Sequence, residues 1–351
     1  MATGAARPIL QTSPSRSARI AEGTPEKRLL DIRGLKTHFK TDDGWLHAVD
    51  GVDIGVDRGQ TVSVVGESGC GKTVTAMTIL KLLPMPPGKI VGGEVLWQGR
   101  DLVAASGEEM RRVRAKEIAI VFQEPMTSLN PVYTIGEQIA ESLRLHEGMS
   151  RKAAFDRAVE MLALVRIPTP ERRVRDYPHQ FSGGMRQRVM IAMALACKPK
   201  LVIADEPTTA LDVTIQAQIL DLLQDMKERF GMAVMLITHA MGVVAETAQR
   251  VVVMYAGKVV EEALVDDLFG DPRHPYTQGL IRSIPRIDLD SGHKTRLEAI
   301  GGSVPILINP APGCRFAPRC RHAMPVCAER APVLREIAQS HRMACHLGDA
   351  P

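Results

Sequence analysis

The 351-residue sequence has no long apolar run, and none approaches the roughly 18 consecutive residues that cross a bilayer. Its N-terminus lacks the apolar centre of a secretory signal, so we expect the chain to stay in the cytosol. No internal repeat is visible, and 44 basic residues are nearly balanced by 40 acidic ones, which argues against a nucleic-acid binder. With 45% hydrophobic and 24% charged residues, the composition is that of a globular protein.

Cysteine is scarce, and its distribution is uneven. Of the six cysteines, Cys70 and Cys197 lie far along the chain from the other four. Those four gather near the C-terminal end of the sequence, at Cys314, Cys320, Cys327 and Cys345. Because a reducing compartment disfavours disulfide bonds, this grouping indicates a metal site before it indicates disulfides.

The order of apolar patterns along the chain predicts an α/β fold. Residues 1–27 mix Ala, Ser, Pro and Arg without a period and are interpreted as a mobile tail. Short strand-like runs follow from Leu29, and later buried-strand runs alternate with helical segments, which predicts a parallel sheet. Between Pro125 and Pro178 the pattern is helical only, and we interpret residues 126–178 as a helical insertion. From 263 the chain becomes Pro-rich and predicts a small, separate, irregular element.

The stretch GESGCGKT at 66–73 matches the P-loop spacing between a predicted strand and a predicted helix. Gly66, Gly69 and Gly71 let backbone N–H groups wrap a β-phosphate. Lys72 would meet the β and γ oxygens, and the Thr73 hydroxyl would bind Mg²⁺. A chance Gly-rich turn is the competing interpretation, and the flanking elements disfavour it.

A second apolar run, LVIADEP, ends in two acids. Asp205 could hold Mg²⁺ through water, and Glu206 would lie where it can deprotonate an attacking water. Taken alone, two acids at a strand end indicate only a solvated turn, but a P-loop requires such partners. Gln123 and His239 also follow apolar runs and carry little information by themselves.

The order of these motifs, with FSGGMRQR at 181–188 between Gln123 and Asp205, resembles the ATP-binding subunits of ABC transporters. The resemblance implies a P-loop NTPase (RecA-like) core with a parallel sheet, a small antiparallel β-subdomain and a helical insertion. It also implies that the Ser-Gly-Gly of one subunit closes over ATP held by another. The residues expected to bind the cofactor ATP are Phe39, Gly66, Glu67, Ser68, Gly69, Cys70, Gly71, Lys72, Thr73, Asp205, Ser182, Gly183, Gly184 and Asp212.

The resemblance also assigns roles to single residues. Glu206 would be the general base, His239 the contact to the γ-phosphate and Gln123 a sensor that, with Thr73, binds Mg²⁺. Asp212 would act across the subunit interface. The adenine is assigned to Phe39, with Trp45 and His47 as weaker alternatives. Many relatives have Asp after the histidine, where this chain has Ala240.

Four longer segments resemble one branch, the dipeptide and oligopeptide permease ATP-binding subunits, which also include nickel and other small-solute importers. Those segments are QEPMTSLNPVYTIGEQI, YPHQFSGGMRQRVMIAMALACKP, PTTALDVTIQAQI and PRHPYTQGL. The likeness implies an ATPase domain over 28–262 and a C-terminal extension over 263–351.

Membership of that branch implies partners and a location. The partners are a second ATPase subunit of a different chain, two transmembrane permease subunits and an extracytoplasmic solute-binding protein, with no nucleic acid. The location is the cytoplasmic face of the inner membrane. The alternative is a soluble iron-sulfur ABC ATPase that acts on ribosomes or nucleic acid, and the solute stays unspecified.

The cysteine spacing C-x5-C-x6-C-x17-C leaves three possibilities open: an iron-sulfur cluster, tetrahedral zinc, or plain reduced or disulfide cysteines. The resemblance favours a 4Fe-4S cluster at these four positions. For Cys70 two interpretations also stand. A thiol beside Lys72 and a helix N-terminus would have a lowered pKa and be sensitive to oxidation, or the residue simply fills a small space.

Overall fold

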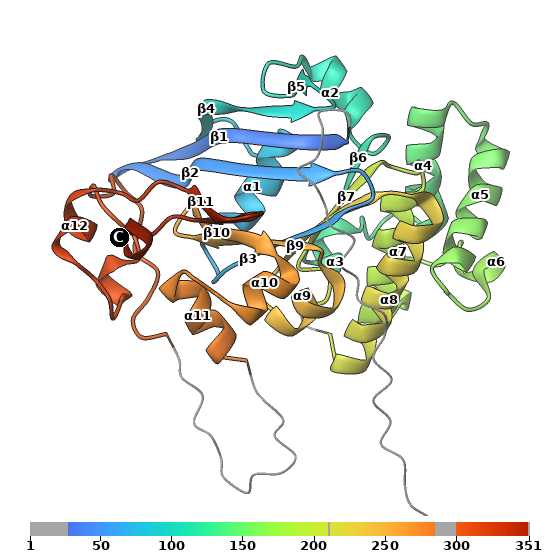
Figure 1. The fold of residues 1–351 in the computed structure, drawn as a ribbon. Coiled ribbons are helices and arrows are strands. Elements are labelled where there is room, and N and C mark those ends of the chain that lie inside the picture. Colours follow the sequence, from blue (N-terminus) through green and yellow to red (C-terminus); the bar gives the residue numbers. More distant parts are fainter. Residues whose placement is uncertain (1–26, 210, 285–299, 350–351) are drawn as a thin grey trace, which may run out of the picture.

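The computed structural model describes residues 27–209, 211–284 and 300–349, so the predicted N-terminal tail lies outside the described residues apart from Lys27. In that part, two sheets are flanked by helices (Figure 1). The larger sheet has the strand order β11-β12-β10-β9-β3-β8-β7-β6. Its strands are β3 (Thr61–Val65), β6 (Ile118–Val121), β7 (Leu201–Asp205), β8 (Ala233–Thr238), β9 (Arg250–Tyr255), β10 (Lys258–Leu264), β11 (Arg335–Ala338) and β12 (His341–Met343).

The centre of this sheet is parallel, as the sequence predicts. Strands β6, β7, β8, β3 and β9 pair in parallel, and every residue of β3, β7 and β8 is buried. Continuous apolar runs suit these strands because helices cover both faces of a parallel sheet. In parallel pairing all five strands run the same way, so their carboxyl ends meet at one edge.

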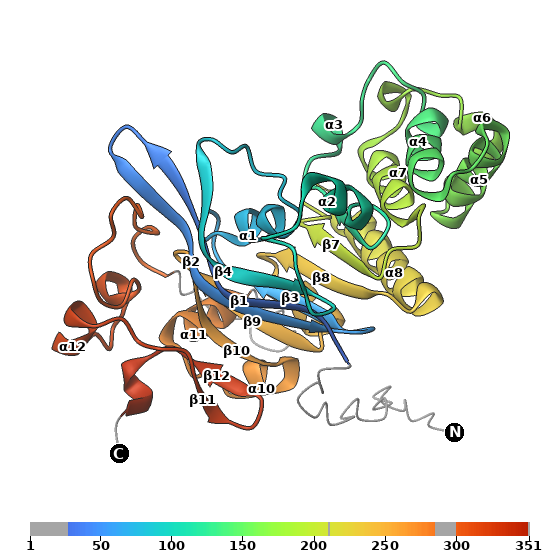
Figure 2. The same ribbon diagram turned by 90° about the horizontal axis from the view of Figure 1, so that it is seen from above.

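The second sheet is antiparallel, with the order β2-β1-β4-β5, and it confirms the predicted small β-subdomain. It packs over helix α1 and one face of the larger sheet in a shared apolar core. Figure 2 shows this layering from above. The strands are β1 (Arg28–Thr41), β2 (Gly44–Asp57), β4 (Gly88–Trp97) and β5 (Arg100–Asp101).

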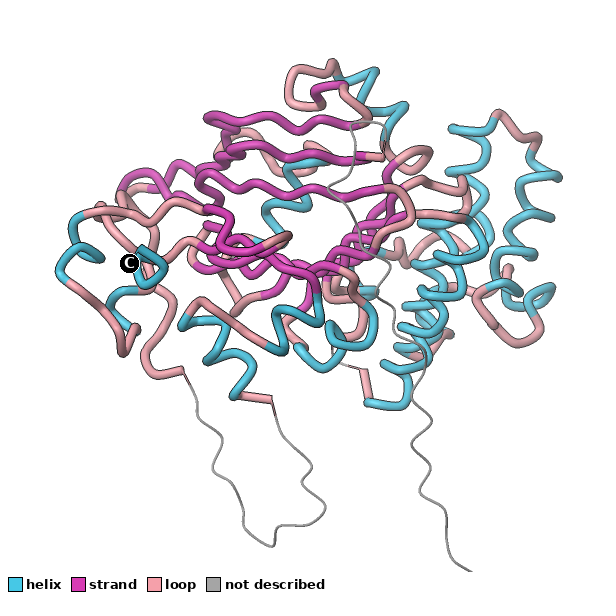
Figure 3. The backbone as a smooth tube through the Cα atoms, viewed as in Figure 1, coloured by secondary structure: helices cyan, strands magenta, loops and turns pink. Residues whose placement is uncertain are grey.

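Most helices of the segment between β6 and β7 lie together at one end of the molecule (Figure 3). Two of them begin with caps that local chemistry predicts, because the Thr134 and Ser150 hydroxyls accept backbone N–H groups in the first turn. The segment between β6 and β7 contains α3 (Pro125–Ser128), α4 (Ile135–Glu147), α5 (Arg151–Leu164), α6 (Pro170–Arg173), the 3-10 turn η1 (Pro178–Gln180) and α7 (Gly183–Leu195).

The remaining helices are distributed over the rest of the fold. The longest, α8, is capped at its C-terminal end by Gly231, which adopts a left-handed φ of 62°, and Lys227 and Arg229 lie in its last turn. None of the helices in the described ranges is long and apolar enough to span a bilayer. These helices are α1 (Lys72–Ile79), α2 (Gly107–Val113), α8 (Val213–Phe230), α9 (Met241–Thr247), α10 (Val265–Gly270), α11 (Pro275–Arg282) and α12 (Pro325–Glu329).

The C-terminal segment is not the separate element that its composition suggests. Strand β12 pairs with β10, and β11 pairs with β12, so this segment extends the edge of the larger sheet. At that edge the fully buried Glu261 carboxylate lies 2.8 Å from His341 Nε2. The two C-terminal strands have only four and three residues, too short to show a period in the sequence.

His274 supplies a test of pH-dependent stability at this edge. It caps α11, its Nδ1 accepts the Tyr276 N–H, and burial lowers the pKa of its imidazole from 6.5 to about 4. A lowered folded-state pKa means that the unfolded chain takes up the proton first, so stability present above pH 6.5 is lost as pH falls toward 4.

His274→Asn keeps a capping acceptor and removes the titration. Between about pH 7.5 and about pH 5, we expect the unfolding free energy of the variant to fall by about 2 kcal/mol less than that of the wild type. Urea denaturation at both pH values measures the difference. Equal losses in the two proteins would show that His274 does not carry this dependence.

Candidate functional site

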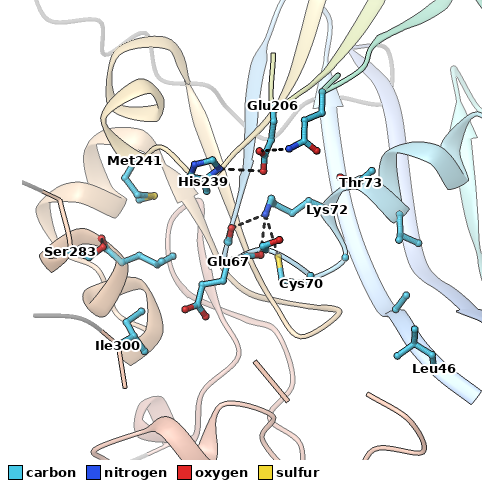
Figure 4. A pocket seen from close by; sticks show the side chains of 18 of the residues that line it. Leu46, Glu67, Cys70, Lys72, Thr73, Glu206, His239, Met241, Ser283 and Ile300 are labelled. Carbon is cyan, nitrogen blue, oxygen red and sulfur yellow. Dashed lines mark hydrogen bonds and ion pairs between the residues drawn. The ribbon is translucent and has the colours of Figure 1, made fainter. Parts of the chain in front are cut away.

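A cavity of about 800 Å³ opens at the edge where the parallel strands end (Figure 4). Strand β3 leads into the loop at 66–73, β6 leads to Gln123, β7 to Asp205 and Glu206, and β8 to His239. Parallel topology therefore brings four motifs together that lie far apart in the sequence. The predicted residues that line the cavity are Phe39, Gly66, Glu67, Ser68, Gly69, Cys70, Gly71, Lys72, Thr73, Gln123, Glu206 and His239.

The loop at 66–73 requires glycine at two positions. Gly66 has φ 151°, and a Cβ there would lie 2.2 Å from the Met254 carbonyl oxygen. Gly71 has φ 101°, and its Cβ would lie 2.4 Å from the Ala48 carbonyl oxygen. The second glycine also caps α1, so the N–H groups of the first helical turn face the cavity. The backbone here is shaped to meet an anion.

Lys72 supplies the positive charge of the loop. Only 5% of the residue is exposed, and its ammonium donates to the Gly66 carbonyl at 2.7 Å and the Glu67 carbonyl at 3.1 Å. A buried ammonium that already lies over the loop is poised to bind phosphate oxygens without a large rearrangement.

Cys70 is buried in the same loop, with no exposed surface. Burial raises the pKa of its thiol above the ordinary value and outweighs the opposing effect of the neighbouring Lys72. The hypothesis of a reactive thiolate with a lowered pKa is therefore wrong, because local sequence reasoning did not include desolvation. The residue fills a small space next to Gly66, whose Cβ would lie 2.8 Å from the Cys70 sulfur.

Glu206 is the centre of a polar cluster that faces the P-loop. Its Oε2 accepts the Thr209 hydroxyl at 2.8 Å and the Gln123 side-chain amide at 3.1 Å. Its Oε1 lies 3.3 Å from His239 Nδ1. The residue has φ 45°, an unusual conformation outside glycine, and its N–H donates to the Ile237 carbonyl. Neighbouring strands thus hold the carboxylate at a fixed point in the cavity.

Asp205, one residue earlier, points away from solvent and is 2% exposed. Burial raises the pKa of its carboxyl, a hydrogen bond with Thr73 opposes that rise, and its Oδ1 has no hydrogen-bond partner. A buried oxygen acceptor beside a hydroxyl matches the oxygen ligands that Mg²⁺ prefers. The pair Asp205 and Thr73 therefore fits the predicted magnesium ion.

The predicted Ser-Gly-Gly segment lies elsewhere. Among the described residues that line the cavity, none comes from 182–184. Ser182 caps α7 by accepting the Met185 N–H, and Asp212 caps α8 by accepting the Ile215 N–H at 2.9 Å. Ser182, Gly183 and Asp212 are all exposed. These helix starts are presented on the surface, not to the chain's own cavity.

The apolar end of the cavity contains Phe39, together with Leu46 and Ala48. Of the two weaker adenine candidates, neither is among the residues that line it. Trp45 is 38% exposed, and the His47 ring stacks on His38 with centroids 3.8 Å apart. Phe39 therefore remains the aromatic candidate for stacking on the adenine ring.

Several residues of the cavity have no sequence motif. Leu280, Ser283 and Ile300 line it from the C-terminal part of the chain. The Tyr276 hydroxyl accepts the Glu67 N–H at 2.8 Å, so this region also supports the loop. Tyr276 and Leu280 lie within the segment PRHPYTQGL, which carries no chemistry by itself, whereas Ser283 and Ile300 follow it and lie in no motif.

The four C-terminal cysteines form a second candidate site. All six cysteines are within the described residues and none is in a disulfide. Burial, together with the three other cysteines of the group, raises the pKa of the Cys345 thiol to about 11. Backbone N–H groups of His322 and Met324 donate to the sulfurs of Cys320 and Cys327. The four thiols are therefore near enough to interact electrostatically, and the backbone donors at two of the sulfurs favour thiolates.

The spacing of these sulfurs bears on the metal. The side chains considered as metal ligands are those of His, Cys, Asp and Glu. Within the described residues, one group of three or more of them has ligand atoms within 4.8 Å of each other, and it consists of His38, His47 and Asp50. No three of the cysteine sulfurs are that close, whereas tetrahedral zinc with bonds of about 2.3 Å places its sulfurs about 3.8 Å apart. The sulfurs are therefore not in the arrangement of a closed tetrahedral zinc site.

Comparison with known proteins identifies the family of the chain. The ABC transporter family model matches residues 49–209, and the model of the oligopeptide/dipeptide transporter C-terminal region matches 260–327. The protein y4tR of Sinorhizobium fredii, named as an ATP-binding protein of a peptide ABC transporter, is 57% identical over 317 residues. That alignment covers 90% of this chain and 94% of y4tR.

Another relative and a solved structure are also ATP-binding proteins of this kind. The oligopeptide transport ATP-binding protein OppD of Bacillus subtilis is 53% identical over 326 residues, which cover 92% of this chain and 90% of OppD. Among solved structures, the dimeric post-hydrolysis state of the ATP-binding cassette MJ0796 bound to ADP and Pi has a TM-score of 0.61 and 30% identity. It covers 68% of this chain and 99% of the cassette.

These similarities confirm the P-loop NTPase fold class and the ATPase activity expected from the sequence. They give no support to the alternative of an iron-sulfur ATPase that acts on ribosomes or nucleic acid. The chain belongs to the ATP-binding subunits of ABC transporters, in the group that carries the oligopeptide/dipeptide transporter C-terminal region.

Proposed function

We propose that this chain is the ATP-hydrolysing subunit of an ABC importer for dipeptides, oligopeptides or a related small solute. The observation that carries the proposal is the Glu206 carboxylate, held by Gln123, Thr209 and His239 at the mouth of a P-loop. The relatives named for peptide transport support the class of solute, because the similarity extends through the C-terminal region.

In this proposal the cavity binds ATP with its base against Phe39 and its phosphates over the P-loop. Lys72 neutralises the β and γ oxygens, and Thr73 with Asp205 holds Mg²⁺, assisted by Gln123. Bound Mg²⁺ would reduce the negative charge on the phosphate oxygens. Glu206 takes the proton of the attacking water, and His239 contacts the γ-phosphate. The fixed position of the Glu206 carboxylate limits the reorganisation needed for that proton transfer.

The exposed caps of α7 and α8 suggest how two subunits cooperate. Ser182, Gly183 and Gly184 present the start of a helix at the surface, where bare N–H groups favour a phosphate. We propose that they cover ATP bound to a second ATPase subunit, with Asp212 across the same interface. The second subunit would be a different chain, and closure of the pair would drive two permease subunits.

The partners define the location. An ATPase subunit that docks on permease subunits is peripheral to the membrane, and we place this chain on the cytoplasmic face of the inner membrane. An extracytoplasmic binding protein would deliver the solute to the assembled transporter. Nucleic acid has no role in this scheme.

Two measurements test the function. A tagged chain, expressed from its own locus and solubilised in mild detergent, should co-purify with two permease proteins and a second ATPase, as identified by mass spectrometry. Deletion of the gene should abolish uptake of labelled dipeptides and oligopeptides, with recovery by the wild-type gene and not by Lys72→Ala. Ribosomal proteins in place of permeases, with uptake unchanged, would contradict the proposal.

For the C-terminal cysteines we propose a 4Fe-4S cluster bound by Cys314, Cys320, Cys327 and Cys345. The support is a group of four free thiols that interact electrostatically, with backbone N–H donors at two of the sulfurs. Its simplest role is to hold together a Pro-rich segment too small to have a core of its own.

Anaerobic purification should give a brown protein with iron and acid-labile sulfide. Cys327→Ser should lose both, because it removes one ligand thiolate. Cys197→Ser is the matched control, since Cys197 is also buried but lies in the helical part of the core. A colourless, iron-free wild-type protein would refute the cluster.

A further inference from the structure

The P-loop is bound to the cysteine segment by a charged pair. Arg319, which directly precedes Cys320, donates from Nη1 to one Glu67 carboxylate oxygen at 2.6 Å and from Nη2 to the other at 3.0 Å. The Arg319 side chain is only 4% exposed, and that of Glu67 is 30% exposed. A two-pronged pair of this kind fixes both distance and orientation.

Further hydrogen bonds and a ring contact fix the position of the Arg319 guanidinium. Its Nε donates to the Gly301 carbonyl at 2.8 Å, and Nη2 also donates to the Ile300 carbonyl at 3.2 Å. Nη1 lies 3.4 Å from the Tyr255 hydroxyl, and Cζ lies 5.7 Å from the centroid of that ring. The guanidinium therefore has little freedom to follow a moving partner. It acts as a fixed support to which Glu67 is attached.

Glu67 connects this support to the phosphate-binding groups. Its side chain binds Arg319, its N–H donates to the Tyr276 hydroxyl, and its carbonyl accepts the Lys72 ammonium at 3.1 Å. A shift of Glu67 would therefore change the position of an acceptor for Lys72. Glu67 also lines the cavity, so an unpaired carboxylate would face the phosphates.

A second contact of the same kind supports the other end of the loop. Arg315, which directly follows Cys314, donates to Asp50 and to the Ala256 carbonyl, each at 2.5 Å. The next residue in the β9–β10 turn, Gly257, donates its N–H to the Cys70 carbonyl at 2.9 Å. Arginines beside two of the four cysteines thus brace the P-loop.

We propose that Arg319 is a positioning residue for ATP binding, through which the P-loop and the four-cysteine segment are thermodynamically coupled. The inference rests on the cavity being the ATP site. Because coupling between two sites is reciprocal, order in the cysteine segment increases nucleotide affinity, and bound nucleotide increases the order of the segment. The cysteine segment would then contribute to nucleotide binding, in addition to extending the edge of the larger sheet.

The effect of the cysteine segment on nucleotide affinity can be tested by calorimetry. The anaerobically purified full chain is titrated with the non-hydrolysable analogue AMP-PNP. Arg319→Met should weaken binding about tenfold, within the usual range for coupled sites. Glu67→Gln should weaken it similarly, and the double variant should be no worse than Arg319→Met, because both changes remove one interaction. Arg319→Lys, which keeps the charge and one donor, should lie between Arg319→Met and the wild type.

Arg342→Met is the matched control. It removes another arginine–glutamate pair between the C-terminal segment and the core, with Glu262 at 3.2 Å, and it does not border the cavity. Its affinity should equal that of the wild type. Three outcomes would each show that the Arg319–Glu67 pair does not position the P-loop. They are unchanged affinity in Arg319→Met, additive losses in the double variant, and full recovery in the double variant.

Hydrogen exchange tests the reciprocal effect, that of bound nucleotide on the order of the cysteine segment, and it does not rely on activity. In the wild type, AMP-PNP should slow amide exchange both in the P-loop and in residues 314–327. Arg319→Met should lose the second effect, and Arg342→Met should keep it. No protection of 314–327 in the nucleotide-bound wild type would overturn the inference, even where Arg319→Met fails to fold. A wild type that does not bind AMP-PNP would instead refute the proposed ATP site.

Discussion

Glu206→Gln should retain ATP binding and reduce the turnover of the assembled transporter on the order of 10² to 10³ or more. Glutamine has nearly the same shape and can still accept the Thr209 hydroxyl, which lies 2.8 Å from the carboxylate. It cannot accept the proton of an attacking water at neutral pH, and a positioned base contributes about this factor. Steady-state phosphate release from the purified complex measures the loss, and equilibrium binding of ATP measures what is kept.

The matched control is Glu228→Gln, an exposed carboxylate on α8 that bonds only the neighbouring Gln224 in the described structure. It should hydrolyse ATP at the wild-type rate. If Glu206→Gln also hydrolyses at that rate in the assembled complex, Glu206 is not the base. A loss of ATP affinity equal to the loss of turnover would instead make it a binding residue.

Lys72→Ala should abolish measurable nucleotide retention, with a fall in affinity on the order of 100-fold or more. Lys72 is 5% exposed, so its ammonium would exchange loop carbonyls for phosphate oxygens in a site largely shielded from water. Charge-assisted hydrogen bonds of that kind are stronger than those in solvent. Titration with ATP in the presence of Mg²⁺ measures the effect.

Lys81→Ala is the control for this variant. Lys81 lies just beyond the end of α1, and its ammonium donates to the Ala105 carbonyl at 2.7 Å, yet it does not line the cavity. It therefore loses a comparable lysine–carbonyl bond with no expected change in affinity. ATP affinity in Lys72→Ala equal to that of the wild type would contradict the P-loop assignment.

The residues that could be predicted share one property: their chemistry is encoded in short, contiguous stretches at strand ends. GESGCGKT places three glycines, a lysine and a threonine within one turn, and the structure gives two of those glycines conformations that exclude a side chain. Glu206, Gln123 and His239 are uninformative singly, but parallel strands ending at one edge must bring them together. Their order along the chain was therefore enough to place them in one cavity.

Residues that depend on burial or on long-range contact could not be placed in this way. The Cys70 thiol appears activated when only Lys72 and the helix start are considered, yet desolvation raises its pKa. Arg319 lies 252 positions from Glu67 in the sequence, and no spacing rule connects them. Similarly, Ile300 lines the cavity only because the C-terminal segment returns to the sheet.

The sequence alone predicted the fold class and the family, because both depend on local pattern: strand and helix periods, glycine spacing and the order of motifs. Only the tertiary structure decided that the C-terminal segment joins the main sheet through β12, and that its arginines support the P-loop. The physical reason is that such contacts arise from packing between distant segments, where short strands and single ion pairs leave no periodic trace in the sequence.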